Sequence, residues 1–166
     1  MKKLFCIIML LLILAGVAIA QEQGDPKKGT VRFDPADIFI NLHNALPGIS
    51  TTWTRYVSPD LGIPVELDVH IGWGVIPGVQ ISLLSGVEYF PPGFVNKERS
   101  GIVLDAKLGI SVLIQDEISP AIICKANVGY QFISGRGLVF TPGAGVIYNG
   151  HNGFGLNFNL ALGFTY

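Results

Sequence analysis

The sequence predicts an all-β fold, an eight-stranded antiparallel up-and-down transmembrane β-barrel. Three observations predict it. The last eleven residues alternate without exception between apolar and small or polar residues, seven earlier segments repeat this pattern, and the chain is rich in glycine but poor in charge. Successive side chains of a strand point to opposite faces, so each segment has one apolar face and one small or polar face. A tilted strand of about 9–11 residues spans the core of a bilayer.

The closing segment, 156–166, shows the alternation most clearly. Its apolar positions are Leu156, Phe158, Leu160, Leu162, Phe164 and Tyr166, and the positions between them are Asn157, Asn159, Ala161, Gly163 and Thr165. The side-chain period of a strand is two residues, so we expect the first set to face lipid and the second to face the barrel interior.

The other segments lie between residues that favour turns. The eight expected strands are 30–41, 48–57, 63–75, 79–90, 102–114, 121–133, 138–148 and 154–166. The first is the weakest, because Pro35 interrupts its alternation, and we expect an imperfect seam between it and the last strand. The longest link, 91–100, falls at the end of the barrel that holds both termini. The links at the other end are short and comprise 42–47, 76–78, 115–119 and 149–153.

A soluble β-sandwich also alternates, but the composition argues against one. Charged residues make up 14% of the chain, well below the roughly 25% of soluble domains. The chain has 21 glycines, many of them at polar-face positions, and glycine weakens the strands of an ordinary sheet. A narrow eight-stranded lumen needs small residues, because side chains from all sides fill one confined core.

Aromatic residues gather at the ends of the expected strands, as in the two interfacial girdles of membrane barrels. The group expected at the end with the termini is Tyr56, Tyr89, Phe132, Phe164 and Tyr166, and the group expected at the other end is Trp73, Tyr148 and Phe154. A general preference of aromatic residues for strands explains their presence but not this clustering.

The first twenty residues have the pattern of a cleavable signal peptide. Lys2 and Lys3 precede an apolar run, and a small-x-small cleavage site ends at Ala20. An uncleaved anchor is the weaker alternative, because the apolar run is shorter than the ~18–20 residues of a span. We predict cleavage after Ala20, a disordered segment at 21–29 and the barrel at 30–166.

Cleavage leaves 146 residues with 9 Lys and Arg against 12 Asp and Glu, a net charge of −3. This balance gives no basic footprint for nucleic acid. The single remaining cysteine, Cys124, excludes an intramolecular disulfide, and its apolar neighbours indicate a small filler on the lipid face.

Charged side chains of both signs occur on the polar faces, where they would point into the lumen. The predicted ion-pair network consists of Glu66, Asp68, His70, Glu88, Asp105, Lys107 and Lys125. Charges in such surroundings must be paired, which favours a plug that fills the barrel. The alternative is a narrow polar path for protons or small ions, for which eight strands leave little room.

A metal site or a cofactor is not predicted. Glu66, Asp68 and His70 share one face at roughly 6.5–7 Å intervals, and three ligands along one strand rarely converge on an ion with bonds near 2 Å. The chain has no P-loop, dinucleotide fingerprint or nucleophile elbow.

The chain resembles the small eight-stranded outer-membrane families, such as the OmpA transmembrane domain, OmpX and OmpW. The sharp motif is the terminal strand with Gly163, Phe164 and Tyr166, because in those families the closing strand ends in an aromatic residue and is the assembly signal. The resemblance implies a porin-like barrel in the outer membrane of a Gram-negative-type bacterium. It also implies contact with lipopolysaccharide or an equivalent outer-leaflet lipid and with the outer-membrane assembly machinery.

Two features bear on the role of such a barrel. The short outer links depart from OmpX-like proteins and argue against an adhesin, since loops normally carry recognition. Some eight-stranded barrels are lipid A deacylases or palmitoyl transferases, and His43, His151 and Ser50 are the residues here that could support an esterase. The deacylase motif is absent, and no acid lies near either histidine in its loop. We therefore expect a structural or interaction role, with a lipid-modifying enzyme or a minor narrow pore as the alternatives.

Overall fold

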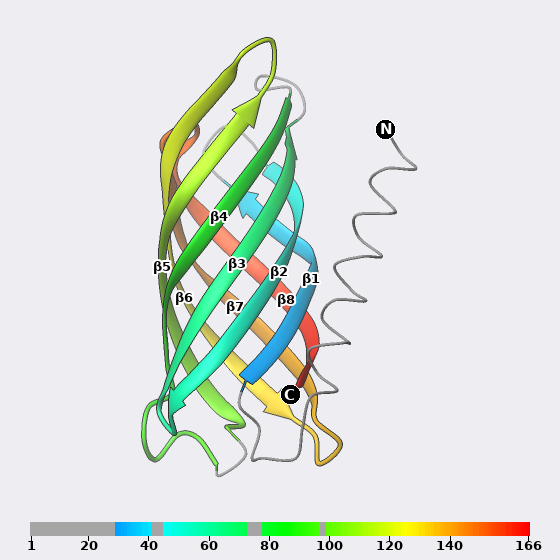
Figure 1. Ribbon diagram of the computed structural model, residues 1–166, viewed down its shortest axis with the longest axis vertical. Helices are drawn as coiled ribbons and strands as arrows, with labels where there is room; N and C mark the ends of the chain where they lie inside the picture. The colour runs from blue at the N-terminus through cyan, green and yellow to red at the C-terminus, as the bar shows by residue number, and fades with distance from the viewer. Residues whose placement is uncertain (1–28, 41–44, 73–77, 97–98) are drawn as a thin grey trace.

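The computed structural model describes residues 29–40, 45–72, 78–96 and 99–166, and these form one closed barrel (Figure 1). The predicted signal peptide, residues 21–28, His43 and Trp73 lie outside the described residues. The strands are β1 (Gly29–Ile40), β2 (Ala45–Ser58), β3 (Leu61–Gly72), β4 (Gly78–Tyr89), β5 (Gly101–Ile114), β6 (Ile118–Ile133), β7 (Leu138–Asn149) and β8 (Gly153–Thr165). No helix in this part of the chain is long and apolar enough to cross a membrane.

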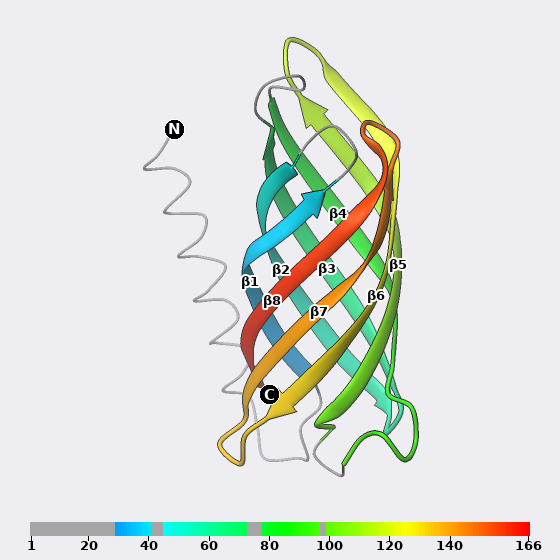
Figure 2. The ribbon, with the colours of Figure 1, turned by 180° about the vertical axis from the view of Figure 1, so that it is seen from behind.

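Every strand pairs antiparallel with the next, and β1 closes the sheet against β8. This confirms the predicted eight-stranded antiparallel up-and-down barrel and excludes the sandwich. Figure 2 shows β1 beside β8 along the closing seam. Gly29 and Tyr166 lie at one end of the barrel, which we call the terminal end, together with the β4–β5 link (Figure 1).

Two links at the opposite end are shorter than the sequence indicated. Residues 45–47 were expected in a loop but belong to β2, and the expected turn 115–119 is shorter because β6 already begins at Ile118. Ile118 pairs with Ile114, and Pro120 lies opposite Val112 within this extended hairpin. The pairing of β6 with β7 begins lower, at Ile123, so Pro120 stands where a missing N–H costs no ladder hydrogen bond to β7.

Pro35 disturbs β1 as expected. The register shifts between Asp34 and Asp37 against β2, and between Phe33 and Ile38 against β8. The Asp34 carboxylate accepts a hydrogen bond from the backbone N–H of Leu160 at 2.7 Å, a donor that lies opposite the bulge. A side chain thus satisfies a backbone group that the interrupted ladder cannot reach.

The alternation of side chains separates two faces. Leu156, Leu160 and Leu162 of β8 are exposed on the outside, whereas Asn157 and Ala161 are buried inside. The outer face of the other strands is equally apolar, with exposed side chains that include Ile63, Val65, Ile71, Leu83, Leu108, Ile110, Ile122, Val128 and Val146. The inner face is mostly polar, with buried side chains that include Thr30, Arg32, Ser50, Thr54, Glu66, Ser82, Lys107, Ser111, Gln131 and Thr141.

Glycines on the inner face stand opposite the larger inward side chains. Gly86 pairs with Lys107, and Gly163 pairs with Arg32. A Cβ at Gly86 would lie 1.9 Å from the carbonyl oxygen of Ala106, and a Cβ at Gly163 would lie 1.8 Å from that of Val31. A side chain at either position would clash with the neighbouring strand, so these glycines leave the lumen to Lys107 and Arg32.

One aromatic residue does not join the girdle to which it was assigned. Tyr56 points into the lumen, where its hydroxyl accepts a hydrogen bond from Gln131 at 3.3 Å and its ring meets Phe90 edge-on at 5.6 Å. Tyr148 and Phe154 lie exposed at the other end, with ring centroids 4.8 Å apart. Tyr56 therefore lies at the predicted end of the barrel but on the inner face, in phase with Ser50, Thr52 and Thr54, and it does not belong to the girdle.

Candidate functional site

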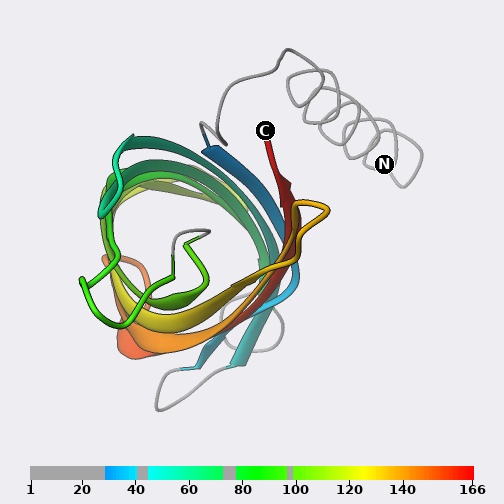
Figure 3. The ribbon, with the colours of Figure 1, turned by 90° about the horizontal axis from the view of Figure 1, so that it is seen from below.

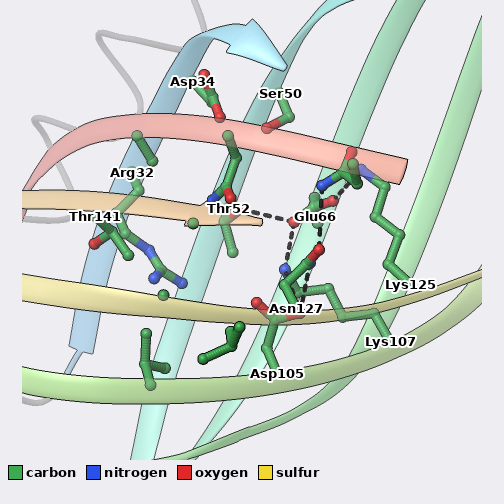
Figure 4. Close-up of a pocket in the computed structure, with 17 residues that line it drawn as sticks. Arg32, Asp34, Ser50, Thr52, Glu66, Asp105, Lys107, Lys125, Asn127 and Thr141 are labelled. Carbon is green, nitrogen blue, oxygen red and sulfur yellow. Dashed lines mark hydrogen bonds and ion pairs between the residues drawn. The ribbon is translucent and has the colours of Figure 1, made fainter. Parts of the chain in front are cut away.

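The centre of the lumen is organised around the carboxylate of Glu66, which β3 directs inward (Figure 4). Its Oε2 atom lies 2.6 Å from Nζ of Lys107 on β5, and its Oε1 atom lies 2.8 Å from Nζ of Lys125 on β6. The hydroxyl of Thr52 on β2 donates to Oε2 at 3.1 Å. One carboxylate therefore joins four strands by charge-assisted hydrogen bonds.

Two further carboxylates extend this cluster. Asp68 Oδ2 lies 2.7 Å from Lys125 Nζ, and Asp105 Oδ1 lies 3.4 Å from Lys107 Nζ. Asp105 also accepts a hydrogen bond from the Asn127 amide at 3.0 Å. We call Glu66, Asp68, Asp105, Lys107 and Lys125 the central cluster. Each lysine in it contacts two carboxylates, so both cations are compensated although both are buried.

A second ion pair lies nearer the terminal end. Arg32 of β1 reaches across the lumen to the carboxylate of Glu88 on β4, and its guanidinium also donates to Thr54 at 3.0 Å. Both charged side chains are buried. Arg32 lies on the one strand whose alternation is broken, so its inward position was not assigned from the sequence.

The β4–β5 link lies over part of the opening at the terminal end, as the view from below shows (Figure 3). Phe90, fully buried, anchors the start of this link through its N–H bond to the Asp60 carbonyl at 2.9 Å. Arg99 near its end lies 4.0 Å over the Tyr56 ring, and its carbonyl accepts a hydrogen bond from Gln131 at 3.1 Å. The sequence placed the link at this end but gave no sign that it would lie over the opening.

The opposite end of the lumen is narrowed by side chains from β3, β4 and the β7–β8 turn. His70 is buried, and its imidazole occupies the space that a Cβ at Gly48 would need. Asn152 in the turn donates to the Gln80 side chain at 3.0 Å, which bridges β4 to residues distant in sequence.

The space left between these groups is small. A cavity of about 20 Å³ lies beside the central cluster, bordered by Arg32, Asp34, Ser50, Thr52, Asn127 and Thr141. This volume suits about one water molecule. This cavity can therefore hold about one water molecule beside the charges, and it is too small for an organic substrate. Within the described residues, no group of three or more His, Cys, Asp or Glu side chains is placed to hold a metal ion.

All seven residues predicted for the ion-pair network lie on the inner face. Five form the central cluster, Glu88 pairs with Arg32, and His70 lies toward the opposite end. Sequence reasoning missed Arg32, Asp34 and Thr52 as participants. Arg32 and Asp34 are two residues apart on β1, and Thr52 is two residues from Ser50 on β2. This spacing could have placed them on the inner face if the bulge at Pro35 had been expected after Asp34.

The described residues of the esterase hypothesis lie in different parts of the barrel. Ser50 faces the lumen beside the small cavity, and His151 lies in the β7–β8 turn with its backbone N–H bonded to Asn149 at 3.0 Å. His43 lies outside the described residues.

The terminal motif closes the barrel. Tyr166 exchanges two backbone hydrogen bonds with Gly29, at 3.1 and 3.0 Å. Phe164 is partly exposed on the outer face, and Gly163 stands inside against β1. The last residues are thus positioned by β1, the first strand of the chain.

No family model and no curated protein matches this chain. Its structure is similar to the crystal structure of the N-terminal β-barrel domain of Pseudomonas aeruginosa OprF, with 16% sequence identity and a TM-score of 0.46, over 87% of this chain and 100% of that chain. The closed eight-strand topology itself follows from the strand pairing described above.

Proposed function

We propose that this chain is an integral outer-membrane β-barrel protein with a structural or interaction role, and that its interior is plugged by polar and charged side chains. The observation that carries the proposal is that the apolar and charged faces of the sheet are reversed relative to those of a water-soluble protein. Large apolar side chains lie exposed outside, and charged side chains lie buried inside. Such a surface is stable against acyl chains and unstable in water.

The closed sheet supports the same location. In a bilayer core every backbone N–H and C=O must find a partner within the protein, and only helices and closed barrels achieve this. Here the ladder runs around the whole barrel, and the Asp34 carboxylate serves the Leu160 N–H at the interrupted seam. In the proposed orientation the terminal end faces the periplasm.

The plug is supported by the density of contacts in the lumen. The central cluster links β3, β5 and β6, and the Arg32–Glu88 pair links β1 and β4. A remaining cavity of about 20 Å³ is far below the ~300–1,000 Å³ of ordinary ligand pockets. We therefore propose a closed barrel rather than an open pore or a lipid-modifying enzyme.

The experiment is to refold the mature chain with and without lipid vesicles and to compare unheated with boiled samples on detergent gels. We expect faster migration of the unheated sample only after refolding with lipid. We also expect no steady conductance when the refolded protein is added to planar bilayers. A monomer that folds in plain buffer would contradict the membrane location, and stable unitary conductance would contradict the plug.

A further inference from the structure

The outer face carries an apolar groove at the terminal end, over β1, β6, β7 and β8. Its volume is about 580 Å³, within the ~300–1,000 Å³ range of small-molecule sites. Phe33, Phe132, Leu138, Phe140, Leu162 and Phe164 line it. We call the depression lined by these residues the apolar groove. The six side chains point away from the charged interior, although Val139 and Gly163 of the inner face also border the groove.

Aromatic rings form the walls of the groove, and the sheet is irregular where the groove lies. Phe132 stacks on Phe140 with centroids 5.9 Å apart, and Tyr130 lies 4.5 Å from Phe132. The β6–β7 ladder runs to Gly129↔Gly143 and resumes at Phe132↔Phe140, with Pro142 in the interval. Proline has no N–H to give, so the two strands are less tightly joined where the groove lies.

One end of the groove is polar. Ser134 lines it, and the Ser134 hydroxyl oxygen accepts a hydrogen bond from the Leu138 N–H at 3.0 Å, which leaves its proton free to donate. Arg136 is exposed in the turn between these two residues. The groove is therefore amphipathic, with an apolar body and a cationic, hydroxyl-bearing mouth at the level expected for lipid headgroups.

The charges at the two ends of the barrel differ in sign. Among the described residues outside the lumen, the terminal end carries Arg55, Arg99 and Arg136 against Asp60, whereas the β5–β6 hairpin at the opposite end carries Asp116 and Glu117. A basic rim attracts anionic headgroups. The charge complementarity thus favours an anionic ligand at the mouth of the groove.

We propose that the apolar groove binds an acyl chain of an anionic glycerophospholipid from the leaflet at the terminal end, with the headgroup at Arg136 and Ser134. This rests on the proposed membrane location, because the lipid is taken from the surrounding leaflet. The continuous apolar outer face brings acyl chains to the groove from both sides, and burial of each methylene adds to affinity.

The test is native mass spectrometry of the refolded protein in detergent, titrated with dioleoyl phosphatidylglycerol or with dioleoyl phosphatidylcholine. Arg136→Gln removes the cation at the mouth, and Arg55→Gln removes an equal charge at the same end but on β2, beyond β1. Phe132→Ala removes a groove wall, and Phe158→Ala removes the same ring from the outer face of β8 away from the groove. Heat-modifiable migration verifies the fold of each variant first.

We expect one tightly held phosphatidylglycerol and weaker phosphatidylcholine. Arg136→Gln should weaken phosphatidylglycerol about fivefold, the effect of one juxtamembrane charge, while Arg55→Gln changes it less than about twofold by distance and screening. Phe132→Ala should weaken both lipids and Phe158→Ala neither. Equal affinity for the two lipids, or equal effects within either matched pair, would overturn the lipid site. So would a dimer without bound lipid, which would make the groove a contact between copies. Each of these results leaves the membrane location intact, whereas folding without any amphiphile removes the proposed function itself.

Discussion

The β5–β6 hairpin and the β8–β1 seam solve one problem in two ways. Pairing of β5 with β6 is unbroken from Gly101↔Gln131 to Ile114↔Ile118. Pairing of β1 with β8 breaks between Phe33 and Ile38, where the Asp34 carboxylate takes the Leu160 N–H. In a bilayer no water can serve an unpaired backbone group. A regular ladder therefore satisfies its own backbone N–H and C=O groups, whereas an irregular ladder depends on a particular side chain.

The charged groups follow the same division. Lys107 and Lys125 stand on the regular hairpin and meet Glu66 on β3 from two sides. Arg32 stands on the irregular strand and meets Glu88 from across the lumen. Loss of a carboxylate from the central cluster therefore leaves buried cations behind, whereas loss of the Asp34 carboxylate at the seam leaves a backbone donor.

The largest effect is expected for Glu66→Ala. Removal of this carboxylate weakens the compensation of Lys107 and Lys125 in a buried site, and we expect the free energy of unfolding to fall by about 3–5 kcal/mol. Urea unfolding of the barrel in lipid vesicles measures it. Asp60→Ala, in the exposed β2–β3 turn, is the control and should change stability by less than about 0.5 kcal/mol.

A double variant sharpens this test. Glu66→Leu combined with Lys107→Met replaces a buried ion pair by apolar side chains and should recover part of the loss, because such replacements are often neutral. If the double variant is as unstable as Glu66→Ala, the barrel needs this charged pair for its stability, and avoiding an unpaired buried charge is not enough.

The next effect is expected at Leu160, which lies at the seam and is exposed on the outer face. Leu160→Arg should cost about 2–4 kcal/mol, because in the proposed membrane location it places a cation near the middle of the bilayer. Asn159→Ala, its inward neighbour, should cost much less in the same titration. Equal tolerance of both substitutions would contradict the facing of β8.

Strict alternation made most of the fold predictable from the sequence. Where apolar and polar residues alternate without interruption, as in 156–166, the facing of each side chain follows from the period of the strand. The expected limits of β4 and β5 differ from the observed ones by a residue. The inward position of Glu66, Asp68 and His70 was predictable for the same reason.

The rest was not predictable because it depends on contacts between distant segments. The phase of β1 after Pro35 is set by its pairing with β8, which alternation alone does not specify. Arg32 was therefore missed although it holds Glu88. Tyr56 lies at its predicted end, but its inward contacts with Phe90 and Gln131 join segments that are distant in sequence. The position of the β4–β5 link likewise depends on contacts of Arg99 with Tyr56 and Gln131.

A smaller effect is expected at Asp34, where the seam itself can be broken. Asp34→Ala leaves the Leu160 N–H without its acceptor and should cost about 1–3 kcal/mol. Asp34→Asn keeps a side-chain oxygen at the same place and should cost less. Amide hydrogen exchange at Leu160 separates the two variants, since it should quicken in Asp34→Ala and stay slow in Asp34→Asn. Unchanged exchange in both variants would show that the seam does not depend on this carboxylate.

The smallest effect is expected at Ser85 of β4, which contacts Pro64 inside β3. The Ser85 hydroxyl donates to the carbonyl of Pro64 at 2.8 Å, from β4 to β3. The β3–β4 ladder runs to Gly62↔Glu88 and resumes in the same register at Val65↔Ser85, so this bond bridges a short gap in a ladder that keeps its register. Ser85→Ala should therefore cost only about 0.5–1.5 kcal/mol, and Ser85→Thr, which keeps the hydroxyl, should cost less. Unfolding titrations in vesicles measure both losses of stability. A loss at Ser85 as large as that at Asp34 would mean that a ladder that keeps its register depends on such a side-chain bond as much as the β8–β1 seam does.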